Sequence, residues 1–276
     1  MAKITAAEVN KLRKQTGAGM MDCKNALVEN DGDFEKAIDY LRKKGQKVAA
    51  KRSDRDATEG VVLAKTNADN TFASVLMLNC ETDFVAINED FIAFTRSLLD
   101  AAVENKAKSM DELKAIEIDG RTIEDLVTDQ VGKIGEKIQI GDYGYLEGAY
   151  VNFYIHAGNK IATAVELSKN VEGVAETSKD VAMQVAAMNP VALDKNSIPQ
   201  ETIDRELEIA KDVIRQEGKP EHMVEKISMG KLNKFFKENT LTSQAFIKDS
   251  KINVETYVKQ IDKDLVVTNF LRFALA

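Results

Sequence analysis

The side chains that could bind a metal or carry out catalysis are few in this sequence and far apart. The chain contains two cysteines, Cys23 and Cys80, and two histidines, His156 and His222. None of them is paired at the Cys-x-x-Cys or His-x-x-x-His spacing that zinc sites use. His156 ends an apolar run and is only a weak candidate for a general base; a histidine satisfied at a sheet edge or interface is the simpler interpretation. We therefore expect no metal site.

Motifs for phosphate, dinucleotide and acyl-transfer chemistry are also missing. The sequence has no Gly-x-x-x-x-Gly-Lys-Ser/Thr loop, no Gly-x-Gly-x-x-Gly after a strand and no Gly-x-Ser-x-Gly turn. The segment from Gly132 to Gly135 has two glycines but neither the spacing nor a preceding strand. Neighbouring acids such as Glu206 and Glu208 are explained by solvated helix faces. The sequence therefore indicates a protein that is not an enzyme and needs no cofactor.

One short segment, residues 79–85, presents an acid and a large aromatic side chain next to each other. Asp83 and Phe84 lie there, between an apolar strand-like run and an amphipathic helix. The residues alone leave two interpretations open. In the first, this is an ordinary helix start, with Asp83 as the cap and Phe84 buried. In the second, it is the tip of a loop that docks on another protein.

The N-terminal segment has the signals of three short helices. Thr5-Ala6-Ala7-Glu8 is a capping box, in which side chains and backbone amides at positions 5 and 8 bond reciprocally. The predicted helices cover residues 5–15, 21–29 and 34–44, with the third ending at Gly45. Such a bundle has a marginal core and suits a docking module better than an enzyme. Residues 46–55, which are basic, are interpreted as a linker that is helical in part.

Two later segments share a pattern of glycine, strand, turn, strand, loop and helix. The first comprises a hairpin over residues 61–78, a helix over 89–104 and a less regular helical stretch at 123–134. The second comprises a hairpin over 148–167 and a helix over 178–187. A last strand, 265–273, is expected to pair with the second sheet. We predict an α+β fold with two related core halves and small antiparallel sheets.

A charged segment interrupts the second half. Ile203, Leu207, Ala210 and Ile214 are spaced 4, 3 and 4 apart, which predicts a narrow apolar seam on a helix. Gly218-Lys219-Pro220 breaks this helix before a second one, so we expect a projecting helical hairpin. The predicted parts are a three-helix domain with linker (1–55), a first core half (56–140) and a second core half (141–276) interrupted by the hairpin at about 194–238.

Composition limits the class of protein. Hydrophobic residues make up 44% and charged residues 30% of the 276, and the net charge is −7. An acidic chain without tryptophan has little material for binding nucleic acid. Two cysteines far apart indicate a reducing compartment, and no apolar run approaches the about 20 residues that span a bilayer. We expect a cytoplasmic protein with no membrane contact.

Several ordered motifs closely resemble the bacterial translation elongation factor Ts family. They are Thr16-Gly17-Ala18-Gly19-Met20-Met21-Asp22-Cys23-Lys24-Asn25-Ala26-Leu27, Asn79-Cys80-Glu81-Thr82-Asp83-Phe84-Val85, Ile134-Gly135-Glu136-Lys137-Ile138, Tyr154-Ile155-His156-Ala157-Gly158 and Leu241-Thr242-Ser243-Gln244. The resemblance covers nearly the whole chain. It departs from the family at the end, where members commonly continue with a charged helical module, and at Ala245, where proline is common.

The resemblance implies a guanine-nucleotide exchange factor for the GTPase elongation factor Tu, with an N-terminal domain like the ubiquitin-associated domain and a coiled-coil insertion. It implies a role for each motif. Thr82, Asp83, Phe84 and Val85 would intrude beside the partner's Mg²⁺ site. Met20, Met21 and Lys24 would dock the N-terminal domain, and Ile134, Gly135 and His156 would belong to the contact surface of the core. Some members would use the hairpin to form a homodimer or heterotetramer.

Two alternatives of other classes stay open. The weaker is a nucleotide hydrolase, which would be refuted if the purified chain alone bound no nucleotide; the other is a binding module. The basic stretch at residues 46–55, which contains Lys47, Lys51, Arg52 and Arg55, would suit a ribosome- or RNA-associated binding module. A basic run of this kind is usually only solvated. A steep dependence of RNA affinity on salt would favour this alternative.

Overall fold

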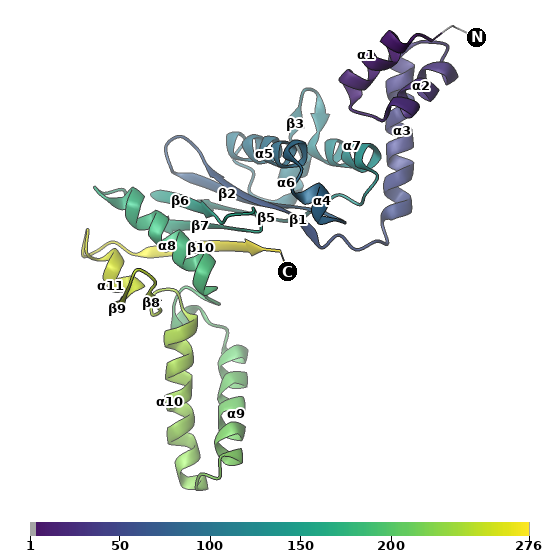
Figure 1. Ribbon diagram of the computed structural model, residues 1–276. Helices are drawn as coiled ribbons and strands as arrows, with labels where there is room; N and C mark the ends of the chain where they lie inside the picture. The colour runs from purple at the N-terminus through teal and green to yellow at the C-terminus, as the bar shows by residue number, and fades with distance from the viewer. Residues whose placement is uncertain (1–3, 276) are drawn as a thin grey trace. The chain divides into compact units, whose positions relative to one another are not determined.

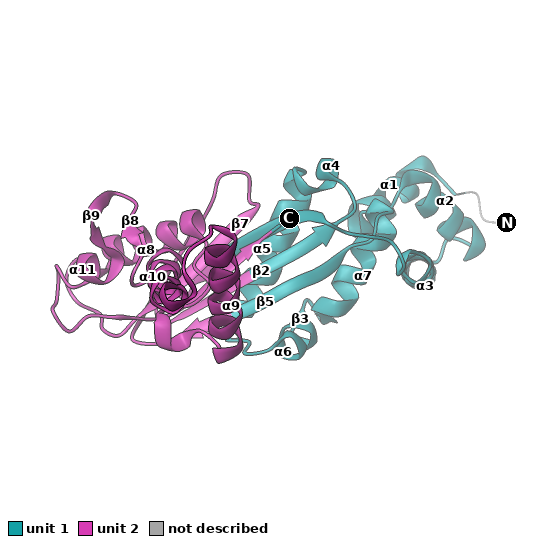
Figure 2. Ribbon diagram, turned by 90° about the horizontal axis from the view of Figure 1, so that it is seen from below, with its two compact units in different colours: residues 1–63, 76–144, 275–276 teal, residues 64–75, 145–274 magenta. Residues whose placement is uncertain are grey.

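The computed structural model describes residues 4–275 and shows a mixed helix and sheet fold (Figure 1). The chain divides into two compact units, shown in separate colours in Figure 2. The first contains residues 1–63, 76–144 and 275–276, and the second contains residues 64–75 and 145–274. The α+β fold class is confirmed. The boundaries predicted for the three parts of the chain stay a prediction.

The N-terminal bundle forms as its capping signals predict. Its helices are α1 (Ala6–Thr16), α2 (Met20–Glu29) and α3 (Phe34–Arg52). The capping box of Thr5 and Glu8 is present, and α1 ends at Gly17 in the left-handed conformation that glycine favours. The small core of the bundle contains Leu12, Cys23 and Leu27, all fully buried.

The prediction that the third helix ends at Gly45 is wrong. Helix α3 continues to Arg52, so most of the expected linker is helical. Gly45 is buried against Gly132 of helix α7 (Ile123–Ile134), and it is the missing side chain of Gly132 that allows the two helices to approach closely, since a Cβ there would lie 2.7 Å from the Cα of Gly45. Glycine here serves helix packing and not helix termination.

Each core half contains a three-stranded sheet with the same order of strands. The first sheet has the order β1-β2-β5 and the second β10-β7-β6, so in both a later strand pairs with the second strand of a hairpin. The strands are β1 (Glu59–Thr66), β2 (Phe72–Cys80), β5 (Gln139–Glu147), β6 (Tyr150–Ile155), β7 (Ile161–Leu167) and β10 (Val267–Ala274). The pairing of the last strand with the second sheet is confirmed.

Helices follow the two hairpins as expected. The single turn α4 (Asp83–Ala86) and helix α5 (Glu89–Glu104) come after the first hairpin, and α8 (Val174–Met188) comes after the second. Helix α8 begins four residues before the predicted start and packs on β6 and β7. Short elements complete the halves: α6 (Met110–Ala115), β3 (Glu117–Ile118), β4 (Arg121–Thr122), β8 (Ala245–Phe246), β9 (Asp249–Asn253) and α11 (Val254–Val258).

The helical hairpin consists of α9 (Gln200–Gln216) and α10 (Glu221–Asn239), preceded by a 3-10 turn at Lys195–Ser197. Its seam is as thin as the sequence predicts, because Ala210 and Ile214 are buried while Ile203 and Leu207 are half-buried. The facing residues of α10 include Val224 and Leu232. An assembly of two copies through this hairpin stays a prediction.

Candidate functional site

The turn α4 presents Phe84 to solvent. The Phe84 side chain is 79% exposed, and Ile87 directly after the turn is 72% exposed. Thr82 is the residue at the N-cap position and Asp83 is the first residue of the helix. The first interpretation of this segment, with Asp83 as the cap and Phe84 buried, is therefore wrong. Ala86 is buried and Val85 is half-buried, so the side of the turn opposite Phe84 packs against the rest of the protein.

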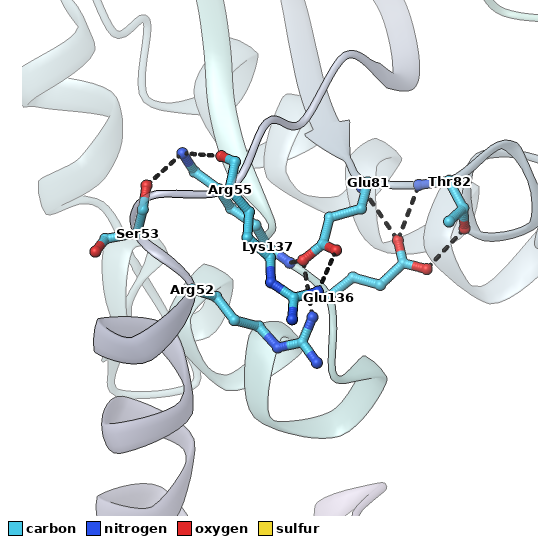
Figure 3. A network of polar contacts seen from close by, with 7 residues as sticks. All are labelled: Arg52, Ser53, Arg55, Glu81, Thr82, Glu136 and Lys137. Atoms are coloured by element: carbon cyan, nitrogen blue, oxygen red, sulfur yellow. Dashed lines mark hydrogen bonds and ion pairs between the residues drawn. The ribbon is translucent and has the colours of Figure 1, made fainter.

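A carboxylate from another part of the chain holds the start of this turn (Figure 3). Glu136 lies just after α7, and its Oε2 accepts hydrogen bonds from the backbone amides of Glu81 and Thr82, both at 3.1 Å. Its Oε1 accepts from the Thr82 hydroxyl at 2.7 Å. The first amides of a helix have no partner within the helix, and an anion there is favourable. Glu136 therefore holds the N-cap residue Thr82 and the residue before it, from 54 residues away along the sequence.

Glu81 returns the interaction. Its Oε1 accepts from the amide of Lys137 at 2.6 Å and from Arg52 at 2.9 Å, and its Oε2 accepts from Arg55 at 2.9 Å. These contacts lower the pKa of Glu81 to about 2. The hydrogen bond from the Lys137 amide is the largest cause, and the two arginines add to it. The Lys137 ammonium donates to the carbonyls of Ser53 and Arg55. The turn is thus connected to the ends of both α3 and α7.

The neighbouring thiol cannot act as a nucleophile. Cys80 is buried at the end of β2, and its Sγ donates to the carbonyl of Thr82 at 3.2 Å. Burial, with the nearby Glu136 carboxylate, raises its pKa to about 12, so it stays a thiol at neutral pH. The polar groups of the site hold a loop in place.

The second set of predicted residues lies on the surface of α2. Met20 is 53% exposed and Met21 is 63% exposed, so neither forms part of the bundle core. Lys24 is exposed on the same helix, whereas Cys23 and Leu27 point inward. Two flexible thioether side chains beside an ammonium group make a surface that can adapt to a protein partner.

The third set divides between the two units. Ile134 is the last residue of α7 and Gly135 caps it in the left-handed conformation, with φ of 79°. Both are next to Glu136, so the structure brings them to the same chain segment that holds the turn. His156 is exposed after β6 in the other unit, where its Nδ1 lies 3.1 Å from the Tyr154 hydroxyl.

The residues that hold the turn were not found from the sequence. Glu81 and Glu136 both lie within motifs that carry the family resemblance, but the resemblance implies a role only for their neighbours. The signal that could have found them is a pair of acids directly before Thr82 and directly after Gly135.

Other site types receive no support from the residues described. Within residues 4–275, His, Cys, Asp and Glu side chains form no group of three or more that could hold a metal ion. In the same part of the chain, no helix is long and apolar enough to cross a membrane. In the basic stretch, Arg52 and Arg55 are paired with Glu81, while Lys47 and Lys51 are exposed. The two arginines share the one negative charge of Glu81, so this pairing offsets one of the four named positive charges.

Comparison with known proteins gives a consistent result. The family described as "Elongation factor TS" matches residues 81–276. A protein named Elongation factor Ts from Christiangramia forsetii is 58% identical over all of both chains, and one from Flavobacterium psychrophilum is 55% identical over all of both. A more distant relative of the same name, from Phocaeicola vulgatus, is 40% identical over 99% of this chain and 98% of its own.

Proposed function

The chain belongs to the elongation factor Ts family, and on that premise we propose that it is a guanine-nucleotide exchange factor that releases GDP from the GTPase elongation factor Tu. The observation that carries the proposal is the exposed Phe84 ring on a turn that is held from both sides. Exposed aromatic rings of this kind are typical anchors of protein interfaces. The reaction requires binding and no covalent chemistry.

The proposed mechanism acts on what bound GDP needs from the GTPase. Its phosphates are held by backbone amides of the phosphate loop and by Mg²⁺, which keeps several waters in near-octahedral order. A Phe84 ring inserted between partner helices would shift the elements that position these waters. The Asp83 carboxylate would compete for the water-mediated contacts. Thr82 and Val85, on either side, would set the depth of insertion.

The free energy available is large enough for this task. Burying a phenylalanine ring is worth about 1.5–3 kcal/mol. Each ~1.4 kcal/mol corresponds to a tenfold change in affinity. If the free energy of burying the Phe84 ring is used to distort the nucleotide site, it accounts for a change of roughly 10- to 100-fold in GDP affinity.

The other predicted residues would hold the partner while the turn is inserted. We propose that Met20, Met21 and Lys24 dock the N-terminal bundle on the GTPase. Ile134, Gly135 and His156 would contribute contacts from the core. The exposure of both methionines supports this role, because a residue in the bundle core could not reach a partner. In this proposal the partner is a protein, and no cofactor is bound by this chain.

The test is release of fluorescent GDP from elongation factor Tu in a stopped-flow experiment. We expect the wild-type protein to accelerate release and Asp83→Ala/Phe84→Ala to lose most of that acceleration. The variant should keep its folded state, because both side chains lie outside the core. No acceleration by the wild type, or an equal acceleration by the double variant, would refute the proposal.

A further inference from the structure

The turn α4 has little within itself to keep it folded. It has four residues, and a single helical turn is unfavourable because many dihedral angles are fixed for few hydrogen bonds. Thr82 at the N-cap makes no capping bond with its side chain. The backbone bonds of the turn include those from Ala86 N to Thr82 O, from Ile87 N to Asp83 O and from Asn88 N to Val85 O. Burial does not hold its tip, since Phe84 and Ile87 are both exposed.

Glu136 provides what the turn lacks. Its carboxylate accepts from the amides of Glu81 and Thr82 and from the Thr82 hydroxyl, so both of its oxygens are used at the two residues directly before the turn. Bonds to an ionised acceptor are shorter and stronger than neutral ones. The same two chain segments are joined by a second hydrogen bond with the roles reversed: here the amide of Lys137 donates to the Glu81 carboxylate.

We infer that Glu136 is a positioning residue for nucleotide exchange, acting through Phe84. By holding the backbone at residues 81–82, Glu136 fixes the direction in which the Phe84 side chain points away from the protein surface. Without it, the turn would sample other conformations, and the ring would lose the preorganisation that makes binding energy available for displacement. This inference rests on the proposed function, since the reaction that Glu136 assists is GDP release.

The test is a double-variant cycle in the GDP release experiment. We expect Glu136→Ala to lower the maximal release rate at saturating factor by about tenfold, with a smaller change in the half-saturating concentration. In a Phe84→Ala background the same substitution should change the rate by less than about twofold, because the side chain it positions is gone. Glu136→Gln keeps an acceptor for Thr82 and should fall between Ala and wild type. Glu104→Ala, an exposed carboxylate at the end of α5, is the control and should behave as wild type.

A second measurement needs no partner. The amides of Glu81 and Thr82 are bonded to Glu136, so Glu136→Ala should increase their hydrogen exchange by about tenfold or more while core strands keep their protection. The chain has no tryptophan, so Phe84→Trp gives a single fluorescent reporter on the turn. Its anisotropy should fall when Glu136→Ala is added.

The two measurements separate failure of the inference from failure of the proposed function. If the wild type does not accelerate GDP release, the proposed function is wrong, and Glu136 has no exchange reaction to assist. If the wild type does accelerate release, an equal loss from Glu136→Ala in the Phe84→Ala background would overturn the inference. Unchanged exchange of the Thr82 amide would overturn it as well.

Discussion

A phenylalanine ring that keeps 79% of its surface in water forgoes most of the about 1.5–3 kcal/mol that burial would provide. Phe84 therefore does not stabilise this chain by itself, and its position is maintained by the polar contacts of Glu81 and Glu136. Those contacts are all within the chain, while the ring is free to contact a partner protein. At the scale of single residues, stability and proposed activity depend on different side chains of the same turn.

The ionised form of Glu81 should stabilise the fold in a pH-dependent way. Its pKa is lowered from an ordinary 4.5 to about 2, so folding favours the carboxylate. The stabilisation is complete above about pH 4.5 and is lost as the pH falls toward about 2, because both states then bind the proton. Urea unfolding of wild type and Glu81→Gln should show a difference that is largest near neutral pH and shrinks in acid. A difference independent of pH would contradict this assignment.

At the scale of elements, the contact between α3 and α7 determines where the N-terminal bundle meets the rest of its unit. A Cβ on Gly132 would lie 2.7 Å from the Cα of Gly45, which no real Cβ tolerates. A Cβ on Gly45 would lie 3.6 Å from the Cα of Gly132, an ordinary contact. The two glycines thus face one another but differ in what they can accept.

This difference gives a matched pair of substitutions. Gly45→Ala should be neutral or slightly stabilising, because alanine gains up to about 1 kcal/mol of helix propensity. Gly132→Ala gains the same propensity but overpacks the crossing, which costs about 1–3 kcal/mol, and should lower the melting temperature. Thermal unfolding of both variants is the measurement. Equal stability of the two would mean that the helices do not cross at these glycines.

The elements also show what could be predicted from the sequence and what could not. The capping box of α1 and the bounds of α5 and α7 depend on nearby residues, and they were predicted nearly to the residue. Helix α3 continues past Gly45, where it lies against Gly132, a residue distant in sequence. Strand β5 was missed because its pattern is polar and includes glycine; a Cβ at Gly141 would overlap the amide oxygen of Asn79.

The candidate site, too, could be predicted from the sequence only in part. The motif at Asp83 and Phe84 could be found from the sequence, but the exposure of the ring could not, since local pattern favours burial of a phenylalanine near a helix start. The contact of Glu136 with Thr82 spans 54 residues, and no periodicity indicates it. Long-range polar contacts of this kind need the folded chain.

At the scale of the whole molecule, the proposed contacts come from both units: α2, α4 and the end of α7 in the first, and His156 in the second. The net charge of the chain is −7, and Arg52 and Arg55 both pair with Glu81.

Linkage makes a further prediction at this scale. If the factor weakens GDP binding to elongation factor Tu, GDP must weaken binding of the factor by the same ratio. Calorimetric titration with nucleotide-free and GDP-saturated partner should therefore give two affinities whose ratio equals the change in GDP affinity. Equal affinities for the two forms would exclude exchange by displacement and leave simple complex formation.

The central claim is that the Phe84 ring itself drives GDP release, and the most direct test compares it with an equally exposed neighbour. Phe84→Ala and Ile87→Ala each remove an exposed apolar side chain from the same turn, so they have similar effects on folding. We predict that Phe84→Ala lowers the catalytic efficiency of GDP release by roughly 10- to 100-fold, whereas Ile87→Ala changes it by less than about threefold. Release rates that are the same for both variants and close to wild type would contradict the account.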